Sequence, residues 1–346
     1  MSRTLASVSF VACMMAGGAS AEGLRVSVDI APVHSLVAQV MEGVGTPDLI
    51  VSPGASPHSH RLRPSQAAGL QAADVVIWMG DPLTPWMEGA VDNLAGSASV
   101  LTLIEHPETQ VLPTREMAVF DSDAHEEGHD HEEGHGHEEG HDHGKGHDHE
   151  KGHDHEEGHD HAQGHDHDGH NHGPIDAHAW LEPGNASVWM DAIAATLAKA
   201  DPENAAIYAA NAEAGRADLV ALEAEIDELL TPVRGQRFVV FHDAYQYFER
   251  AFSLTATGAI AVSDASSPSP ARIAQLQDRI RDENVRCILS EPQFSPNLVE
   301  TVMEGVEARS GVLDPLGAAF APGPDHYGQT MRDMAQSLAN CLSPAK

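Results

Sequence analysis

Positive charge is scarce in this 346-residue chain, which has 19 lysines and arginines against 53 aspartates and glutamates, a formal net charge of −34. Such a balance argues against nucleic acid and anionic membrane surfaces as partners, because both would be repelled. The negative charge is unevenly distributed along the chain, since residues 121–173 hold 18 of the acidic residues and only 2 lysines. The rest of the chain is therefore only moderately acidic.

Long apolar runs are also missing. After the N-terminal region no stretch reaches 18 apolar residues, which excludes a later membrane-spanning helix and predicts a soluble mature protein. At the N-terminus, Arg3 precedes a short apolar run over 5–15, and Ala19-Ser20-Ala21 follows. This pattern predicts a secretory signal peptide over 1–21, cleaved after Ala21. The alternative is a lipoprotein processed at Cys13, but Phe-Val-Ala before that cysteine is a poor lipobox.

Cysteine is rare, with 3 in the whole chain. Removal of the signal peptide would leave Cys287 and Cys341, and two cysteines in an exported chain are most simply a disulfide. Closing a loop of that length stabilises a protein by roughly 4 kcal/mol in the chain-entropy model. The alternative is a pair of unpaired thiols.

Apolar side chains are almost absent from one internal segment. Between His125 and His172 the only one is Ala162. A segment of this composition cannot bury enough surface to offset the entropy of ordering it. We therefore interpret residues 121–173 as a disordered insertion.

The insertion is built from a six-residue repeat whose core is His-x-His with flanking acids and a glycine. In an extended chain the two imidazoles of each pair lie on the same side, so each pair can chelate a metal ion. Binding must order a flexible chain, which makes each pair weak. We interpret the segment as a metal antenna or sensor, the alternative being a solvated polyanion that binds metal incidentally. The paired histidines are His129, His131, His135, His137, His141, His143, His147, His149, His153, His155, His159, His161, His165 and His167.

Outside the insertion, short runs rich in Val and Ile alternate with helix-like stretches. Apolar strands that alternate with helices are typical of α/β folds with parallel sheets covered on both faces. The predicted strands lie within residues 24–30, 48–53, 74–80, 99–105, 237–243, 255–262, 285–292 and 310–317.

Two long helices interrupt the alternation between the fourth and fifth strands. The first is predicted over 185–201, and Asp201-Pro202 looks like an N-cap followed by proline at the first helical position. The second is predicted over 202–230, and a helix near 28 residues would be about 42 Å long. That length suits a strut between two lobes. We therefore divide the mature chain into a lobe over 22–177, a helical connection over 178–232 and a lobe over 233–346.

Ligands of parallel α/β sheets bind beyond the carboxyl ends of the strands. Four metal-ligating side chains follow predicted strands or resume the pattern after the insertion: His58, His178, His242 and Asp314. They come from both lobes, so a cleft between the lobes can gather them. Three imidazoles with an oxygen or water make a natural zinc site.

Each of these residues also has a plainer interpretation. His58, like His60, is compatible with a surface loop, His178 with a packed core, His242 with a helix cap, and Asp314 with a turn before Pro315. Glu291 before Pro292 is expected to be structural. His34, His106 and His326 stand in helix or loop contexts without obvious partners and are expected to be solvated.

Several stretches of the chain resemble one family. GASPHSHRLRPSQ, ADVVIWMG, DAHAWLEP, FVVFHDAYQYFE, SEPQFSP and LDPLG, in this order, are similar to the periplasmic high-affinity zinc-binding proteins of ABC importers, within the metal-specific cluster of solute-binding proteins. FHDAYQYFE and LDPLG are the most specific, and an acidic, His-rich insertion before the second histidine is typical of zinc members. The resemblance covers essentially the whole mature chain.

This resemblance implies two α/β lobes, each with a four-stranded parallel sheet flanked by helices, joined by a long rigid backbone helix. It implies one Zn²⁺ in the cleft, bound by His58, His178 and His242, and a disulfide between Cys287 and Cys341. It also implies delivery of the ion from the periplasm to an inner-membrane ABC permease. We expect the protein to be a monomer. Many zinc members have Glu before the first histidine, where this chain has Pro57. The fourth ligand therefore stays open among Asp314, water, His60 and an imidazole of the insertion.

The ligand chemistry agrees with that implication. Manganese-binding relatives have a carboxylate where His242 stands, and imidazole suits Zn, Cu and Ni better than Mn. Three histidines therefore favour zinc over manganese, without excluding Cu²⁺ or Ni²⁺. Two other functions stay open on the sequence: a zinc hydrolase with a three-histidine site, and metal sequestration or buffering without a transporter. We expect a binding protein and no enzyme.

Overall fold

The computed structural model describes residues 23–115, 120, 175–261 and 268–344. Two parallel sheets of four strands form its framework, and all eight strands lie in or next to the predicted apolar runs. The predicted signal peptide over 1–21 and the insertion over 121–173, with its histidine pairs, lie outside the described residues. No described helix is both long and apolar enough to span a membrane.

The first sheet has the order β2-β1-β3-β4 and the second the order β6-β5-β7-β8, so the two share one topology. Each begins with an inner strand, adds an edge strand, and then crosses back to the other side. The strands are β1 (Val26–Val28), β2 (Asp48–Leu49), β3 (Val75–Trp78), β4 (Ser99–Thr102), β5 (Phe238–His242), β6 (Ala256–Ala261), β7 (Cys287–Ser290) and β8 (Arg309–Val312).

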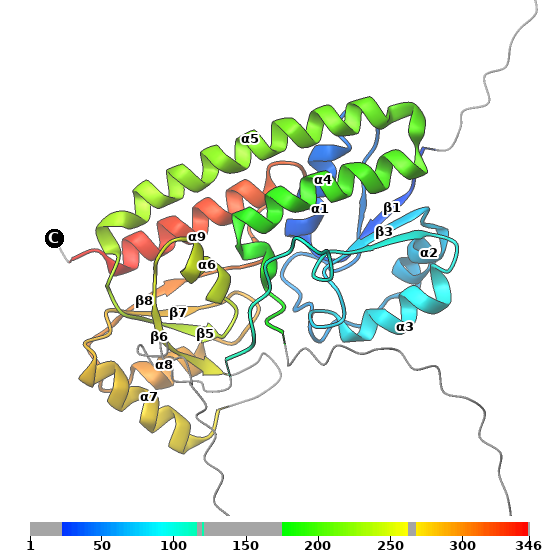
Figure 1. Ribbon diagram of the computed structural model, residues 1–346. Coiled ribbons are helices and arrows are strands. Elements are labelled where there is room, and N and C mark those ends of the chain that lie inside the picture. The colour runs from blue at the N-terminus through cyan, green and yellow to red at the C-terminus, as the bar shows by residue number, and fades with distance from the viewer. Residues whose placement is uncertain (1–22, 116–119, 121–174, 262–267, 345–346) are drawn as a thin grey trace, which may run out of the picture.

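Helices cover both faces of each sheet (Figure 1). Several begin with proline in the first turn, where its missing N–H is not needed. The helices are α1 (Ala31–Val40), α2 (Pro64–Ala72), α3 (Pro85–Leu94), α4 (Pro183–Ala200), α5 (Ala205–Leu230), α6 (Gln246–Ala251), α7 (Pro270–Asp282), α8 (Asn297–Met303) and α9 (His326–Leu342), with short 3₁₀ turns η1 (Ala179–Leu181), η2 (Pro202–Asn204) and η3 (Thr231–Val233).

Strand alternation divides the core. Val75 and Ile77 of β3 face a large central cluster, whereas Val76 and Trp78 face a smaller outer cluster under α2 and α3. In β5 the even residues face the central cluster and the odd residues an outer cluster under α7 and α8. The central cluster is continuous through both lobes, because the buried residues of α4, α5 and α9 belong to it.

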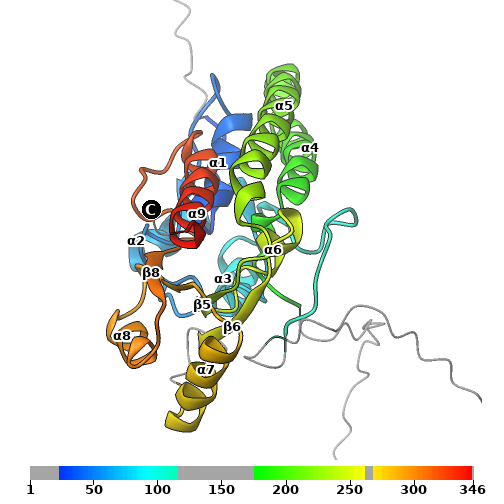
Figure 2. The same cartoon turned by 90° about the vertical axis from the view of Figure 1, so that its left-hand side faces the viewer.

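The long helix α5 lies along both lobes. It packs against α4, α1 and α9, and Figures 1 and 2 show these four helices gathered on one side of the sheets. Its buried residues recur every three or four positions, as in Leu219, Leu222 and Ile226. The 26 residues of α5 give a length of about 39 Å, which lets one helix touch both lobes.

The start of α5 differs from the prediction. The carboxylate of Asp201 accepts hydrogen bonds from the Asn204 amide (2.6 Å) and the Tyr208 hydroxyl (2.9 Å), and Asp201 stands at the N-cap of a short 3₁₀ turn. Residues 202–204 therefore form the 3₁₀ turn η2, and the α-helix starts at Ala205.

The C-terminal helix α9 returns to the first lobe. The Ser35 hydroxyl of α1 accepts a hydrogen bond from the Tyr327 N–H (2.9 Å) and donates one to the Pro324 carbonyl (2.7 Å). A disulfide joins Cys287 of β7 to Cys341 of α9, with a Cα–Cα distance of 5.7 Å. This bond ties α9 to the second sheet, so one helix links both lobes.

Candidate metal centre

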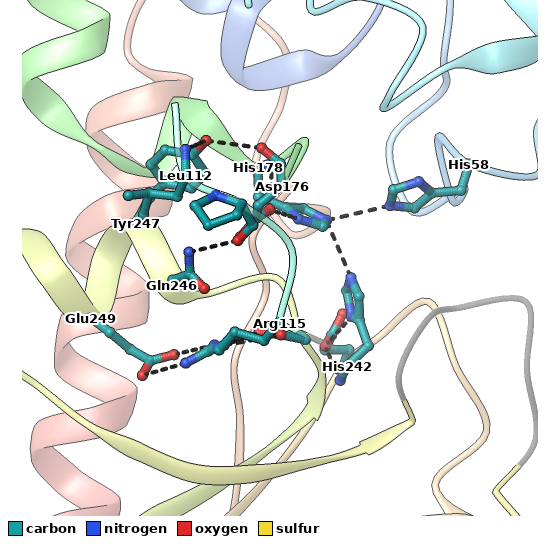
Figure 3. Close-up of polar contacts among 12 residues, drawn as sticks. His58, Leu112, Arg115, Asp176, His178, His242, Gln246, Tyr247 and Glu249 are labelled. Atoms are coloured by element: carbon teal, nitrogen blue, oxygen red, sulfur yellow. Dashed lines mark hydrogen bonds and ion pairs between the residues drawn. The ribbon is translucent and has the colours of Figure 1, made fainter. Parts of the chain in front are cut away.

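Three histidines from distant parts of the chain meet between the lobes (Figure 3). His58 lies in the loop after β2, His178 directly precedes η1, and His242 is the last residue of β5. The Nε2 atom of His178 is 3.3 Å from Nε2 of His58 and 3.4 Å from Nε2 of His242. Their ligand atoms all lie within 4.8 Å of one another.

These separations match those of nitrogens that share one ion. Tetrahedral zinc with Zn–N bonds of about 2.0–2.1 Å places two ligand nitrogens about 3.3–3.4 Å apart. The two separations from His178 therefore fit one tetrahedral ion, and the His58 and His242 nitrogens lie within 4.8 Å of each other.

Two buried carboxylates orient two of the imidazoles. The Nδ1–H of His178 donates to Asp176 Oδ1 (2.7 Å), and the Nδ1–H of His242 donates to Glu291 Oε1 (2.7 Å). Because a carboxylate only accepts, each ring carries its proton on Nδ1 and directs the lone pair of Nε2 at its neighbours. Carboxylates in this position fix the tautomer and orientation of metal-bound histidines.

These carboxylates add to what the sequence reasoning offered. Glu291 was expected to have a structural role, and its contact with His242 makes that role specific, since β7 is the neighbour of β5. Asp176 was not singled out, although an acid two residues before a histidine is a usable signal. Burial raises the pKa of Asp176 to about 7, against the lowering effect of the His178 N–H and of Arg115. A cation at the three nitrogens would favour the ionised carboxylate.

The loop that carries His58 is held at the residue before it. The indole N–H of Trp86 in α3 donates to the Pro57 carbonyl at 2.6 Å. His58 itself is half-buried, whereas His178 and His242 are 7% and 6% exposed. The site is thus built from two buried ligands and one on a more exposed loop.

Two suggested fourth ligands have other partners. Asp314 accepts hydrogen bonds from the Gln293 amide (2.8 Å) and from the N–H groups of Leu316 (3.0 Å) and Ala318 (2.6 Å), and it stands outside the three-histidine group. His60 contacts the Gln66 amide oxygen at 3.2 Å and also stands outside the group. The insertion's imidazoles lie outside the described residues.

The expectation of solvated histidines is wrong for His34 and His326. Both are buried, at 4% and 0% exposure. The His34 Nε2 contacts the Pro47 carbonyl (2.9 Å), and the His326 Nε2 contacts the Leu316 carbonyl (2.9 Å). They pack in the core because each imidazole finds a backbone acceptor, which sequence context alone does not reveal. His106 is half-buried.

A small cavity surrounds the three imidazoles. Pro57, Trp180, Phe294 and Leu316 contribute apolar walls, and Glu291 and Gln293 contribute polar ones. It leaves about 20 Å³ of free space, which is room for one water molecule or one metal ion. The site is shaped for an ion and not for an organic substrate.

A half-buried arginine lies below the histidines and links the two lobes. Arg115, which lies beyond β4 of the first lobe, donates to both oxygens of Asp243 (3.0 Å each) and to both oxygens of Glu249 (2.8 and 3.2 Å). Its guanidinium lies 3.6 Å from the ring centre of Phe120. Asp243 directly follows His242, the last residue of β5, so the Arg115 contacts hold the end of this strand. Figure 3 shows Arg115 between Glu249 and His242.

A hydroxyl continues this network toward Asp176. The Tyr247 hydroxyl accepts from the Leu112 N–H (2.9 Å) and donates to the Asp176 carbonyl (2.9 Å). Segments of the first lobe and the helix α6 of the second are thus held together beside His178.

Comparison with known proteins points to metal uptake. Residues 26–341 match the family described as zinc-uptake complex component A, periplasmic. The chain is 45% identical over 345 residues to the high-affinity zinc uptake system protein ZnuA of Brucella suis, and the match covers 99% of each chain. Among solved structures, a crystal structure of ZnuA aligns with a TM-score of 0.70 at 22% identity, covering 93% of this chain and 100% of that one. The periplasmic zinc-binding protein TroA of Treponema pallidum aligns with a TM-score of 0.70 at 19% identity, covering 93% of this chain and 100% of that one.

Proposed function

Because the chain belongs to the family of periplasmic zinc-uptake component A proteins, we propose that it captures Zn²⁺ at His58, His178 and His242 and delivers the ion to an inner-membrane permease of an ABC importer. It is a zinc-binding component of high-affinity zinc uptake and not an enzyme. One observation carries the proposed site: three Nε2 atoms from both lobes converge at separations of 3.3 and 3.4 Å.

The ligand set supports zinc as the cargo. Three neutral imidazoles suit Zn²⁺. Asp176 and Glu291 accept hydrogen bonds from the Nδ1 atoms of His178 and His242, and their negative charge makes these imidazoles stronger ligands. Manganese prefers oxygen ligands, and no carboxylate belongs to the described three-residue group. Selectivity against Cu²⁺ and Ni²⁺ then depends on tetrahedral geometry, which the nitrogen separations favour.

The cavity argues against hydrolysis. A hydrolytic zinc site needs an open position and room for the substrate beside it. The described walls leave about 20 Å³, which does not admit an ester or peptide. Capture and release of an ion needs no such room.

The remaining features of the proposal come from the sequence. Export would follow cleavage after Ala21, and the mature protein would act as a monomer. The histidine pairs of the insertion over 121–173 would collect ions weakly and raise their concentration near the cleft. In the sequence the insertion ends at residue 173, five residues before His178.

Growth in low zinc tests the proposal. A strain that lacks its own zinc-binding protein would receive the full chain, a variant with His58, His178 and His242 all changed to Ala, or a variant with His106→Ala as the control. We expect the full chain and the control to restore growth and the triple variant to fail. Rescue by the triple variant would overturn the site, and failure of the full chain to restore uptake despite export would favour sequestration.

A further inference from the structure

Within the described parts of the chain, one polar atom in the wall of the metal cavity has no hydrogen-bond partner. The side-chain oxygen of Gln293 is buried and contacts no donor among the residues that the structure describes. Gln293 lines the cavity together with the three histidines and Glu291. Buried polar atoms in folded proteins nearly always have partners, and an exception next to an ion site points to a group that arrives with the ion.

The orientation of this amide is fixed by chemistry. Its Nε2 donates to Asp314 Oδ1 at 2.8 Å, and an ionised carboxylate only accepts. Turning the amide over would place two oxygens against each other, so Oε1 is the atom directed away from Asp314. Asp314 is itself fixed by the N–H groups of Leu316 and Ala318.

The same segment already serves the site. Glu291, two residues earlier, follows β7 and orients His242. Gln293 therefore lines the metal cavity from the second lobe, on the segment that orients His242.

Three imidazoles leave one tetrahedral position of the ion to fill. Among the described candidates, the Pro57 side chain has no ligand atom, and Asp314 and His60 have other partners and stand outside the group. We propose, building on the proposed function, that Gln293 completes the zinc site by accepting a hydrogen bond from the water that takes the fourth position. Water suits that position better than the amide itself, because zinc prefers nitrogen, sulfur and carboxylate ligands to neutral amide oxygen.

In this arrangement Asp314 acts on the zinc site through Gln293. Its carboxylate does not coordinate the ion but fixes the amide that holds the bound water. The chain Leu316 N–H, Asp314, Gln293 and water then links the loop after β8 to the ion. Because the Gln293 amide is neutral, the two positive charges of the ion are balanced by the carboxylates of Asp176 and Glu291.

The test uses the mature protein with Gln293→Leu, which removes the amide at similar size, and Gln277→Leu as the control. The Gln277 amide donates to carbonyls at the end of α8, away from the cavity. Competition with a calibrated chelator would measure zinc affinity, and the visible spectrum of the Co²⁺ form would report the ligand set. We expect zinc affinity to fall by about 10-fold or more in Gln293→Leu, the Co²⁺ bands to change shape, and the control to match the unchanged protein.

Two results would overturn the inference. One is unchanged affinity together with an unchanged Co²⁺ spectrum in Gln293→Leu. The other is a crystal structure of the zinc-loaded protein in which Gln293 Oε1 bonds the ion directly or contacts no water on it. If the unchanged protein itself bound zinc weakly, the proposed function would fail instead. Thermal unfolding of both variants would show that each folds.

Discussion

The two lobes share one strand order but present their histidines differently. In the second lobe His242 ends the inner strand β5, is buried, and is held by Glu291 from the neighbouring strand's end. In the first lobe His58 lies in the loop after the edge strand β2 and is half-buried. His178, between the lobes, resembles His242, since it is buried and held by a carboxylate.

This difference gives the ligands unequal freedom. A ligand that is already ordered loses less entropy when the ion binds, so it contributes more net affinity. We therefore expect His178 and His242 to form a prepared pair and the loop of His58 to complete the site.

Acidification should have the largest effect, because it acts on the ligands of both lobes at once. Each imidazole must be neutral to bind the ion. Because free histidine titrates near pH 6.5, we expect protons to compete with the ion below about that pH. Affinity is present above about pH 6.5 and falls as the pH decreases, by about 10⁴-fold between pH 7.5 and 5 for three histidines. Chelator competition at both pH values measures this. Full occupancy at pH 5 under dilute zinc would contradict histidine ligation.

Removing the ligands one at a time should distinguish what each lobe contributes to zinc affinity. Tetrahedral zinc sites bind with about 10–16 kcal/mol in total, so one ligand is worth roughly 10²–10³-fold in affinity. In zinc titrations we expect His178→Ala and His242→Ala to lose affinity near the upper end of this range and His58→Ala near its lower end. The control His106→Ala should keep the affinity of the unchanged protein. A greater loss for His58→Ala than for the buried pair would reverse the comparison.

Removing the brace between the lobes should lower stability. Arg115→Met would leave Asp243 and Glu249 buried without their cation, and breaking such a pair costs about 3–5 kcal/mol. Because the Arg115 side chain is 21% exposed, we expect about 3 kcal/mol in urea unfolding. The control Arg332→Met removes an exposed pair with Glu225, worth below about 1 kcal/mol. Equal effects of the two variants would show that Arg115 does not brace the lobes.

Changing the orienting carboxylates should have a smaller effect. Partners of metal-bound histidines are typically worth about 10–100-fold in affinity. We expect losses in this range for Asp176→Asn and Glu291→Gln, and none for Glu300→Gln on the surface of α8. Wild-type affinity in both buried variants would mean that the imidazoles are oriented by packing alone.

The framework was open to prediction because buried parallel strands are short apolar runs, and all eight runs contain or adjoin a strand. The three histidines could be predicted because His58 and His242 follow strands, His178 stands where the pattern resumes after the insertion, and all three lie in familiar motifs. The contact of Glu291 with His242 could not be predicted, because it depends on β7 lying beside β5 and sequence spacing does not give the strand order. The burial of His34 and His326 and the reach of Arg115 across the lobes likewise depend on tertiary packing.

The central claim is that the cleft, and not the His-rich insertion, holds the cargo ion. The most direct measurement is a competition titration with a calibrated zinc chelator at pH 7.5, comparing the mature protein with a version that lacks residues 121–172. We predict that one tight site survives the deletion and that only weaker sites disappear. Loss of the tight site with the insertion would contradict the assignment of His58, His178 and His242.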